Sequence, residues 1–324
     1  EIMFISKGNY ISSLSFNFDL YLFSKMSLFQ NQKVVNQKLP DLDGVQITIK
    51  REDLLHPTVS GNKFRKLKYN LEQAIIEGYN SILTFGGPFS NHLAATAAAG
   101  RILGFKTIGI IRGDEKRQNP TLQFCQDQGM TLFPVSRSTY CEKDTSRFHE
   151  TLIKKFGKFY LLPEGGTNSM AVRGCSEILT TEDKYFDAIC CSVGTGGTLS
   201  GLIESAQSYQ TVLGFAALLH KELEYEIERF TEKKNWKINH DYVFGGYAKI
   251  SLPLIEFINH FNKKFKIPLD PIYTGKLLFG IFDIIKQKQW NWGKRILVIH
   301  SGGLQGIAGM NQILSEKEWP KIEV

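Results

Sequence analysis

The feature that most restricts the fold of this 324-residue chain is a regular alternation of expected strands and helices. Short β-rich runs such as residues 81–87 (SILTFGG) and 105–113 (FKTIGIIRG) alternate with helical patterns such as residues 90–104. Strands joined through helices lie parallel, and a parallel sheet needs helices on both of its faces. Two such series follow one another along the chain. The sequence therefore predicts an α/β protein with two open, twisted parallel-sheet domains and flanking helices.

Four of the expected strands run into glycine-rich loops, with the sequences TFGGPFSN, PEGGTNS, SVGTGGT and IHSGG. Ligands of open α/β sheets bind at the carboxyl ends of the strands. The loop at residues 192–201, SVGTGGTLSG, leads into a helix, whose first N–H groups can bind a phosphate. Leu199 stands where a dinucleotide fingerprint needs its third glycine. The loop therefore predicts a site for a small phosphate group, with tight packing of the glycines as the alternative.

Residues 60–70, SGNKFRKLKYN, concentrate positive charge at the start of an expected helix. Lys63 lies about 60° from the centre of the apolar stripe of this helix. Among the residues of the first turn, it therefore points most nearly toward the interior. A buried lysine is costly unless it is paired or covalently bound, and burial makes its amine nucleophilic. Arg65 and Lys66 point away from the stripe and Lys68 lies at its margin, and all three are expected to be solvated charges. A Lys63 that merely extends to solvent is the alternative.

Composition favours a reduced, cytoplasmic enzyme. The net charge of +7 could indicate an anionic partner, but Lys and Arg are spread along the chain and no nucleic-acid-binding motif is present. Five cysteines form no CxxC pair, and the seven histidines are scattered, so no metal site is expected. No segment is apolar enough to span a membrane. Residues 1–25 do not resemble a signal peptide; we expect an extension before Met26 that is disordered or adds a strand.

Together, these features describe a site for pyridoxal 5′-phosphate. The loop at 192–201 would hold the phosphate, and the amine of Lys63 would bond covalently to the cofactor aldehyde, with the ring as an electron sink. Ser90 and Asn91 stand at the start of an expected helix. An asparagine there can hydrogen-bond the ring hydroxyl, and the serine with nearby N–H groups suits a substrate carboxylate.

The sequence resembles the 1-aminocyclopropane-1-carboxylate deaminase / D-cysteine desulfhydrase family of fold-type II pyridoxal-phosphate enzymes. Across about residues 34–310, the motifs KREDLLHPTVSGNKFRKLKY, GGPFSNH, PEGGTN, SVGTGGTLSGL, YTGK and HSGG stand in the family's order. The resemblance implies a fold like that of the tryptophan synthase β chain. It implies a large cofactor-binding domain (26–59 plus 166–324), a small domain (60–165) and a homodimer that acts on a small amino acid.

The resemblance also implies roles for single residues. Lys63 would bind the cofactor, Asn91 would contact its ring hydroxyl and Ser90 would contact the substrate. Tyr273 would lie against the ring or the substrate. Tyr247 would be a second active-site tyrosine, with a core aromatic as the alternative. The residues that would hold the phosphate are Gly194, Thr195, Gly196, Gly197 and Thr198.

Two further positions separate the activities within the family. Deaminases carry Glu and Leu where the desulfhydrase-like members carry small hydroxyl residues, and this chain has Thr274 and Ser301. A hydroxyl leaves the pyridine nitrogen of the cofactor neutral, whereas a carboxylate favours its protonation. The resemblance thus favours α,β-elimination from D-cysteine to pyruvate, ammonia and sulfide. Phe89, where desulfhydrases often have Gln, leaves the substrate open. The alternatives are 1-aminocyclopropane-1-carboxylate (ACC) deamination, another lyase or racemase, or a non-catalytic cofactor-binding protein.

Overall fold

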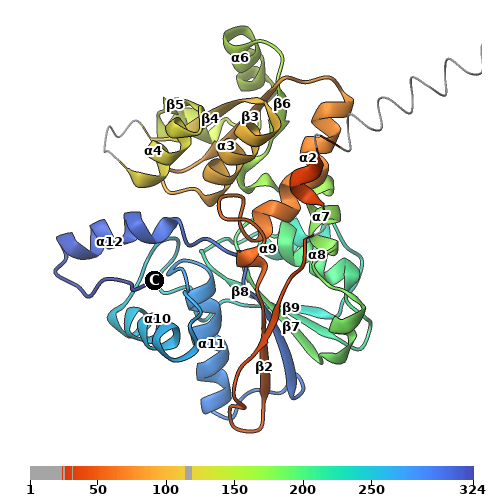
Figure 1. Cartoon of the computed structure of the whole chain (residues 1–324), viewed down its shortest axis with the longest axis vertical. Helices are drawn as coiled ribbons and strands as arrows, with labels where there is room; N and C mark the ends of the chain where they lie inside the picture. The colour runs from red at the N-terminus through yellow and green to blue at the C-terminus, as the bar shows by residue number, and fades with distance from the viewer. Residues whose placement is uncertain (1–23, 25, 31, 114–118) are drawn as a thin grey trace, which may run out of the picture.

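A computed structural model of the chain describes residue 24 and residues 26–30, 32–113 and 119–324. Except for Ser24, the leading segment 1–25 lies outside the described residues. Two sheets organise the rest, and Figure 1 shows the smaller one above the larger. Most of their strands are parallel, as the alternation of strands and helices predicts.

The larger sheet has six strands in the order β1-β2-β10-β7-β8-β9. Only β1 at its edge runs antiparallel, pairing with β2, among the described strands of this sheet. Neither β1 nor β9 is expected from the sequence, because both are short edge strands without an apolar run. The bounds are β1 (Asn36–Lys38), β2 (Gln46–Lys50), β7 (Ala188–Val193), β8 (Thr211–Ala216), β9 (Trp236–Asn239) and β10 (Arg295–Ile299).

Helices cover both faces of this larger sheet, as a parallel sheet requires. Residues of α10, α11 and α12 form one hydrophobic core with one face, and residues of α7, α8 and α9 form a second core with the other. The central strand β7 is buried along its whole length. The bounds are α7 (Ser169–Ser176), α8 (Gly197–Ser205), α9 (Leu223–Glu228), α10 (Leu252–Phe265), α11 (Thr274–Lys286) and α12 (Gly306–Glu316).

The smaller sheet has four parallel strands in the order β5-β4-β3-β6. Its strands are β3 (Ser81–Gly86), β4 (Lys106–Arg112), β5 (Thr131–Val135) and β6 (Tyr160–Leu162). Helices α2, α3 and α4 pack on one face and α5 and α6 on the other. Their bounds are α2 (Asn62–Ile76), α3 (Asn91–Leu103), α4 (Pro120–Asp127), α5 (Arg137–Cys141) and α6 (Ser146–Phe156).

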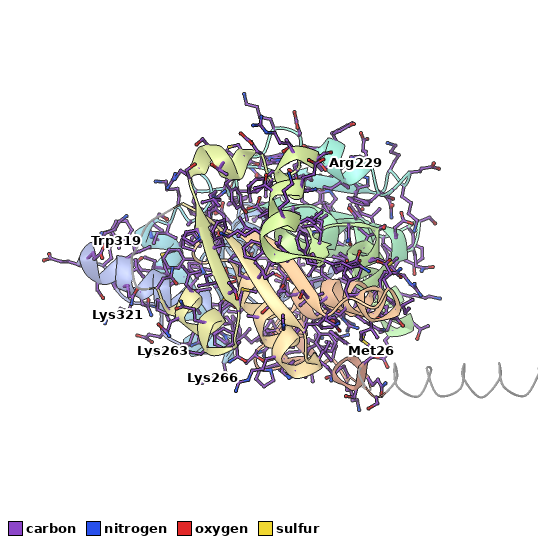
Figure 2. The ribbon with its side chains drawn as sticks, turned by 90° about the horizontal axis from the view of Figure 1, so that it is seen from above. Met26, Arg229, Lys263, Lys266, Trp319 and Lys321 are labelled. Atoms are coloured by element: carbon purple, nitrogen blue, oxygen red, sulfur yellow. The ribbon has the colours of Figure 1, made fainter. Side chains whose placement is uncertain are left out.

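Four short 3₁₀ helices complete the described elements: η1 (Met26–Phe29), η2 (Glu52–Leu54), η3 (Glu164–Gly166) and η4 (Thr181–Tyr185). Seen from above, Met26 lies at one end of the molecule and Trp319 and Lys321 at the opposite end (Figure 2). None of the helices within the described residues is long and apolar enough to cross a membrane.

Helix α2 joins the two sheet units. It packs with β3 and α3 in the core of the smaller unit, and it also lies against α7 of the larger one. The approach to α7 is close, because a Cβ atom at Gly174 would stand 2.0 Å from the carbonyl oxygen of Arg65. Only glycine fits at that position, so α2 is held on two faces.

Candidate active site

A cavity of about 720 Å³ opens where the carboxyl ends of strands from both sheets meet. The residues that follow β3, β6, β7 and β10, and the last residue of β4, line it. This is the edge at which open α/β sheets bind their ligands. The lining from these strand ends includes Gly87, Ser90, Arg112, Pro163, Glu164, Gly165, Gly194, Thr195, Gly196, Ser301 and Gly302.

Lys63 stands on the cavity wall, in the first turn of α2. Gly61, which precedes this helix, has a φ of +63°, and a Cβ atom there would lie 2.0 Å from the carbonyl oxygen of Ser301. The N–H of Asn62 donates to that same oxygen at 3.1 Å. The first turn of α2 therefore packs directly on the loop after β10. This contact fixes the position of the backbone from which the side chain of Lys63 extends.

The amine of Lys63 is prepared for chemistry. Its Nζ donates to the Oδ1 of Asn62 at 3.0 Å. Removal from water, and then the charge of Lys66, lower the pKa of Lys63 from 10.5 to about 7. A lysine with this pKa has a substantial unprotonated, nucleophilic fraction at neutral pH.

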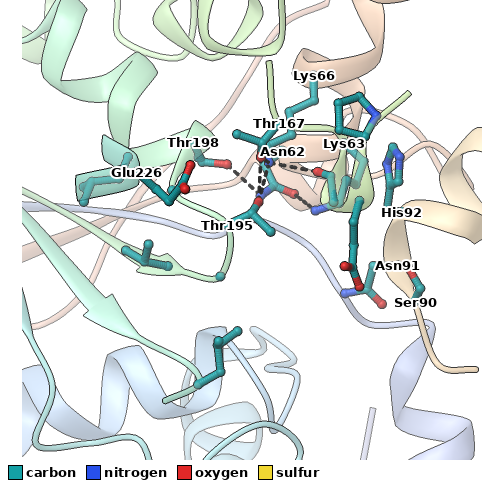
Figure 3. A pocket seen from close by; sticks show the side chains of 18 of the residues that line it. Asn62, Lys63, Lys66, Ser90, Asn91, His92, Thr167, Thr195, Thr198 and Glu226 are labelled. Carbon is teal, nitrogen blue, oxygen red and sulfur yellow. Dashed lines mark hydrogen bonds between the residues drawn. The ribbon is translucent and has the colours of Figure 1, made fainter. Parts of the chain in front are cut away.

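The predicted phosphate loop lines the same cavity as Lys63, and Thr195 and Thr198 lie near Asn62 (Figure 3). Gly196 has a φ of +81° and precedes α8, so the chain turns sharply and the first N–H groups of the helix are left without helical partners. The hydroxyl of Thr198 accepts a hydrogen bond from Asn62 at 2.9 Å, which ties this helix start to that of α2. Gly194, Thr195, Gly196 and Thr198 line the cavity, and Gly197 is the first residue of α8.

Lys66 lies at the same loop, although the sequence predicts it to be solvated. Its side chain is buried, and Nζ donates to the carbonyl oxygen of Gly165 at 3.0 Å and to the hydroxyl of Thr167 at 2.9 Å. Nζ also lies 3.3 Å from the position of a Cβ atom at Gly197. All its hydrogen-bond acceptors among the described residues are neutral, so a buried cation faces a helix start without a counter-charge. An anionic phosphate suits this arrangement.

The prediction that Arg65, Lys66 and Lys68 are solvated charges is wrong. Arg65 pairs with the fully buried Glu52 at 2.8 Å, and Lys68 pairs with Glu177 at 2.7 Å. The reason is that η2, the loop at 165–167 and the end of α7 cover α2 on sides other than the one facing the smaller sheet, whereas the stripe argument considers only one apolar face. The sequence predicts a phosphate held by N–H groups of the loop at 192–201, and the structure places the amine of Lys66 beside the same loop.

Ser90 and Asn91 occupy the predicted helix start. Ser90 caps α3, and its hydroxyl accepts from the N–H of Leu93 at 3.3 Å. Asn91 lines the cavity, and its Oδ1 accepts a hydrogen bond from the side chain of Gln305, which precedes α12. Asn91 thereby links the smaller sheet unit to the larger one at the cavity.

His92 is a cavity residue for which the sequence predicts no role. The hydroxyl of Thr84 donates to the carbonyl oxygen of Leu162 at 3.0 Å and lies 2.8 Å from Nε2 of His92. Since Thr84 has one proton, Nε2 must carry the proton of the ring and donate it, which leaves Nδ1 unprotonated. Burial, and then the charges of Lys63 and Lys66, hold the pKa of His92 well below its usual value, so the ring is neutral.

Two tyrosines face the cavity from the larger sheet unit. Tyr273 precedes α11 and lies against Gly194, with a ring carbon 3.3 Å from the position of a Cβ atom there. Its hydroxyl is hydrogen-bonded to that of Tyr247. Tyr247 lines the cavity and is 38% exposed, so its alternative interpretation as a core aromatic is wrong. Burial raises the pKa of both tyrosines, and both hydroxyls stay protonated at neutral pH.

The two hydroxyl residues that separate the activities are placed differently. Ser301 lines the cavity, with its Oγ 3.3 Å from that of Ser192. Thr274 lies behind the lining, where its hydroxyl donates to the buried Asp270 at 2.7 Å. The predicted direct contact of Thr274 with a cofactor does not agree with this position. Phe89 is also outside the lining and packs on Gly309 of α12.

These two sheet units, with a low-pKa lysine and an anion-binding helix start between them, define a class of protein, the fold-type II pyridoxal-phosphate enzymes. The chain belongs to the family described as pyridoxal-phosphate dependent enzyme, which matches residues 35–302. Its cofactor is therefore pyridoxal phosphate. Within that family it belongs with the ACC deaminases and D-cysteine desulfhydrases.

Three similar proteins support this placement. A Pyrococcus furiosus protein with the provisional name 1-aminocyclopropane-1-carboxylate deaminase is 33% identical over 295 residues, which cover 83% of this chain and 89% of that protein. A mitochondrial bifunctional D-cysteine desulfhydrase/ACC deaminase of Arabidopsis thaliana is 29% identical, covering 83% and 75%. The crystal structure of an ACC deaminase homologue superposes with a TM-score of 0.75 at 28% identity, covering 91% and 98%.

Proposed function

We propose that this protein is a D-cysteine desulfhydrase, which converts D-cysteine and water to pyruvate, ammonia and hydrogen sulfide. The observation that carries the proposal is the hydroxyl-lined wall formed by Ser192 and Ser301. The family's deaminases have Leu at the position of Ser301 and Glu at that of Thr274. Cavity carboxylates among the described residues lie elsewhere, at Asp144, Glu164 and Glu226.

The residues present fit pyridoxal phosphate. Lys63 would bind its aldehyde carbon, and Lys66 with the N–H groups of 194–198 would hold its phosphate. Asn91 would contact the ring hydroxyl. When bound, the cofactor supplies an aldehyde for the substrate amine and a ring that delocalises negative charge from Cα.

Lys63 is our candidate for the base that removes the Cα proton. An amine with a pKa of about 7 can accept that proton at its Nζ near neutral pH. His92 remains neutral, so it adds no further positive charge beside Lys63. Tyr273 and Tyr247 keep their protons and can donate a hydrogen bond to the departing sulfur.

The test is turnover by the loaded enzyme on D-cysteine, L-cysteine and ACC, with sulfide, pyruvate and 2-oxobutyrate measured separately. We expect sulfide and pyruvate from D-cysteine, and an absorbance band at about 410–420 nm from the lysine-bound cofactor. Lys63→Ala should abolish both band and turnover, whereas Lys154→Ala, at an exposed lysine of α6, should change neither. No sulfide from D-cysteine with an intact band would refute the proposal.

ACC deamination is the second candidate, because the Pyrococcus furiosus relative carries that name at 33% identity. In that case the assay would yield 2-oxobutyrate from ACC and little sulfide. A loaded protein that turns over none of a panel of D- and L-amino acids would instead be a non-catalytic cofactor-binding protein.

We also propose a cytoplasmic homodimer. The five cysteines are all unpaired, four of them buried, which agrees with a reducing compartment. The dimer rests on the family resemblance. Light scattering coupled to size-exclusion chromatography would measure it directly, and a mass near the 36.8 kDa of one chain would contradict it.

A further inference from the structure

Arg112 is a cationic residue that lines the cavity. It has no role in the proposed function as described above. It ends β4 and lines the cavity. One guanidinium nitrogen, Nη2, lies 3.3 Å from the position of a Cβ atom at Gly87. The guanidinium carbon stands 5.7 Å from the ring centre of Tyr140, a buried aromatic. The side chain is thus held over the loop that follows β3.

The charge of Arg112 has no partner among the described residues, since no carboxylate of these lies within 4.0 Å of its guanidinium. Two acids line the same part of the cavity, but both are occupied. Lys143 lies 3.0 Å from Asp144 and 3.7 Å from Glu164. The guanidinium therefore keeps its full capacity to bind an anion.

Two other features place this cation at the substrate side of the cavity. The N–H of Ser90 donates to the carbonyl oxygen of Gly87 at 3.0 Å, so the loop under Arg112 leads directly into the start of α3. Across the cavity, the charge of Arg112 acts on the hydroxyl of Tyr247 and opposes the rise in its pKa that burial causes. Arg112 therefore contacts the loop that leads to the helix start expected to receive the substrate carboxylate, and its charge reaches a candidate active-site tyrosine.

We propose that Arg112 is a specificity-determining residue that pairs with the α-carboxylate of the amino-acid substrate. The inference rests on the proposed function in that it assumes an amino-acid substrate. A guanidinium presents two parallel N–H donors that match the two oxygens of a carboxylate, and the helix start adds N–H groups of the same polarity. Amines without the carboxylate would be discriminated against.

The experiment titrates the loaded enzyme with D-alanine and with D-alanine amide, following the change in cofactor absorbance. D-alanine has no leaving group at Cβ, so the titration does not require elimination. We expect Arg112→Gln to weaken the binding of D-alanine about tenfold and to leave that of the amide within twofold. Arg112→Lys, which keeps the charge but loses the fork, should fall between. Arg147→Gln, an exposed arginine on α6, is the matched control and should change neither.

The outcomes are distinct. Equal losses for D-alanine and its amide would show a structural role and overturn the proposal, as would an unchanged affinity for D-alanine. A wild-type enzyme that binds neither D-alanine nor its amide would overturn it too. If the expected contrast appears but D-cysteine is not broken down, the desulfhydrase proposal fails and the role of Arg112 stands.

Discussion

At the scale of single residues, two lysines one turn apart on α2 have different environments. Lys63 faces the open cavity and has a single amide partner, while Lys66 is enclosed by neutral oxygens beside the start of α8. The charge of Lys66 lowers the pKa of Lys63, since a like charge in a poorly solvated site disfavours the protonated form. The charge of Lys66 therefore helps to keep the amine of Lys63 neutral.

This relation gives a pH prediction for the cofactor-free protein. Lys63 should react with an acylating reagent with a midpoint near pH 7, measured by mass spectrometry after short pulses. Because the charge of Lys66 lowers the pKa of Lys63, Lys66→Met should shift the midpoint upward. Lys154 in the same digest serves as the exposed reference. An unshifted midpoint in the Lys66→Met protein would contradict the coupling.

The same pKa makes stability depend on pH. The folded-state pKa of Lys63, about 7, lies below its ordinary value of 10.5. Between these values the unfolded chain binds more protons, so the free energy of unfolding should rise with pH across that window, and the full cost applies below pH 7. Urea unfolding of the cofactor-free protein at pH 7 and pH 9.5 measures it. Lys63→Met should flatten this part of the profile; a slope as steep as that of the wild type would show another source.

At the scale of elements, much of the site follows from the sequence. Glycines at strand ends and helix starts place Ser90, Asn91 and the loop 194–198 correctly on the cavity, because local turn chemistry decides them. The sequence analysis predicts the wrong surroundings for Lys66 and Thr274. Those of Lys66 depend on segments far away in the chain, and the hydroxyl of Thr274 is engaged by a nearby side chain. Gly165 and Thr167, about 100 positions away, accept hydrogen bonds from Lys66, and Asp270 accepts one from the hydroxyl of Thr274.

The start of α2 gives a prediction about glycine. Gly61 and Gly78, at either end of the helix, have φ values of +63° and +70°. A Cβ atom at Gly78 would meet nothing within 4 Å, while one at Gly61 would collide with Ser301. Gly78→Ala should cost about 1 kcal/mol of unfolding free energy, and Gly61→Ala roughly 4 kcal/mol or more with loss of the cofactor band. Equal costs in urea unfolding would contradict the collision.

A buried ion pair at the end of β2 gives another prediction about stability. Lys50, at the end of β2, lies 2.6 Å from Asp183 in η4, and both side chains are almost fully buried. Asp183→Asn leaves a buried ammonium without its counter-charge and should cost about 3–5 kcal/mol. The exposed pair of Lys234 and Glu228 is the control, and Glu228→Gln should cost at most about 1 kcal/mol in the same unfolding assay. A loss below about 1 kcal/mol for Asp183→Asn would refute the argument.

At the scale of the whole molecule, the cavity belongs to neither sheet alone, because strand ends of both line it. The alternation of strands and helices predicts this architecture, because each strand–helix unit can be recognised from its own local sequence pattern. The division of the chain into domains at 26–59, 60–165 and 166–324 stays a prediction. The sequence does not reveal that α2 is shared, because a helix that packs on two partners has no single apolar stripe to find.

A cofactor held by both units should stabilise them together. We expect pyridoxal phosphate at one hundred times its dissociation constant to add about 2.7 kcal/mol to the free energy of unfolding and to raise the melting temperature by several degrees. Lys63→Ala should reduce this gain, since the covalent bond is lost. Calorimetry with and without cofactor measures both, and an equal gain in the variant would argue against Lys63 as the attachment point.

The seating of Asn62 on the carbonyl of Ser301 has a consequence for biosynthesis. The support of the reactive amine leaves the ribosome about 240 positions after the amine itself, and it is in place only when β10 has inserted between β2 and β7. A nascent chain that stops before β10 would contain every element of the smaller sheet. It would still lack the carbonyl group of Ser301, to which the first turn of α2 is bound. Competence to take up vitamin B6 is therefore acquired only after β10 and the loop that follows it have been synthesised.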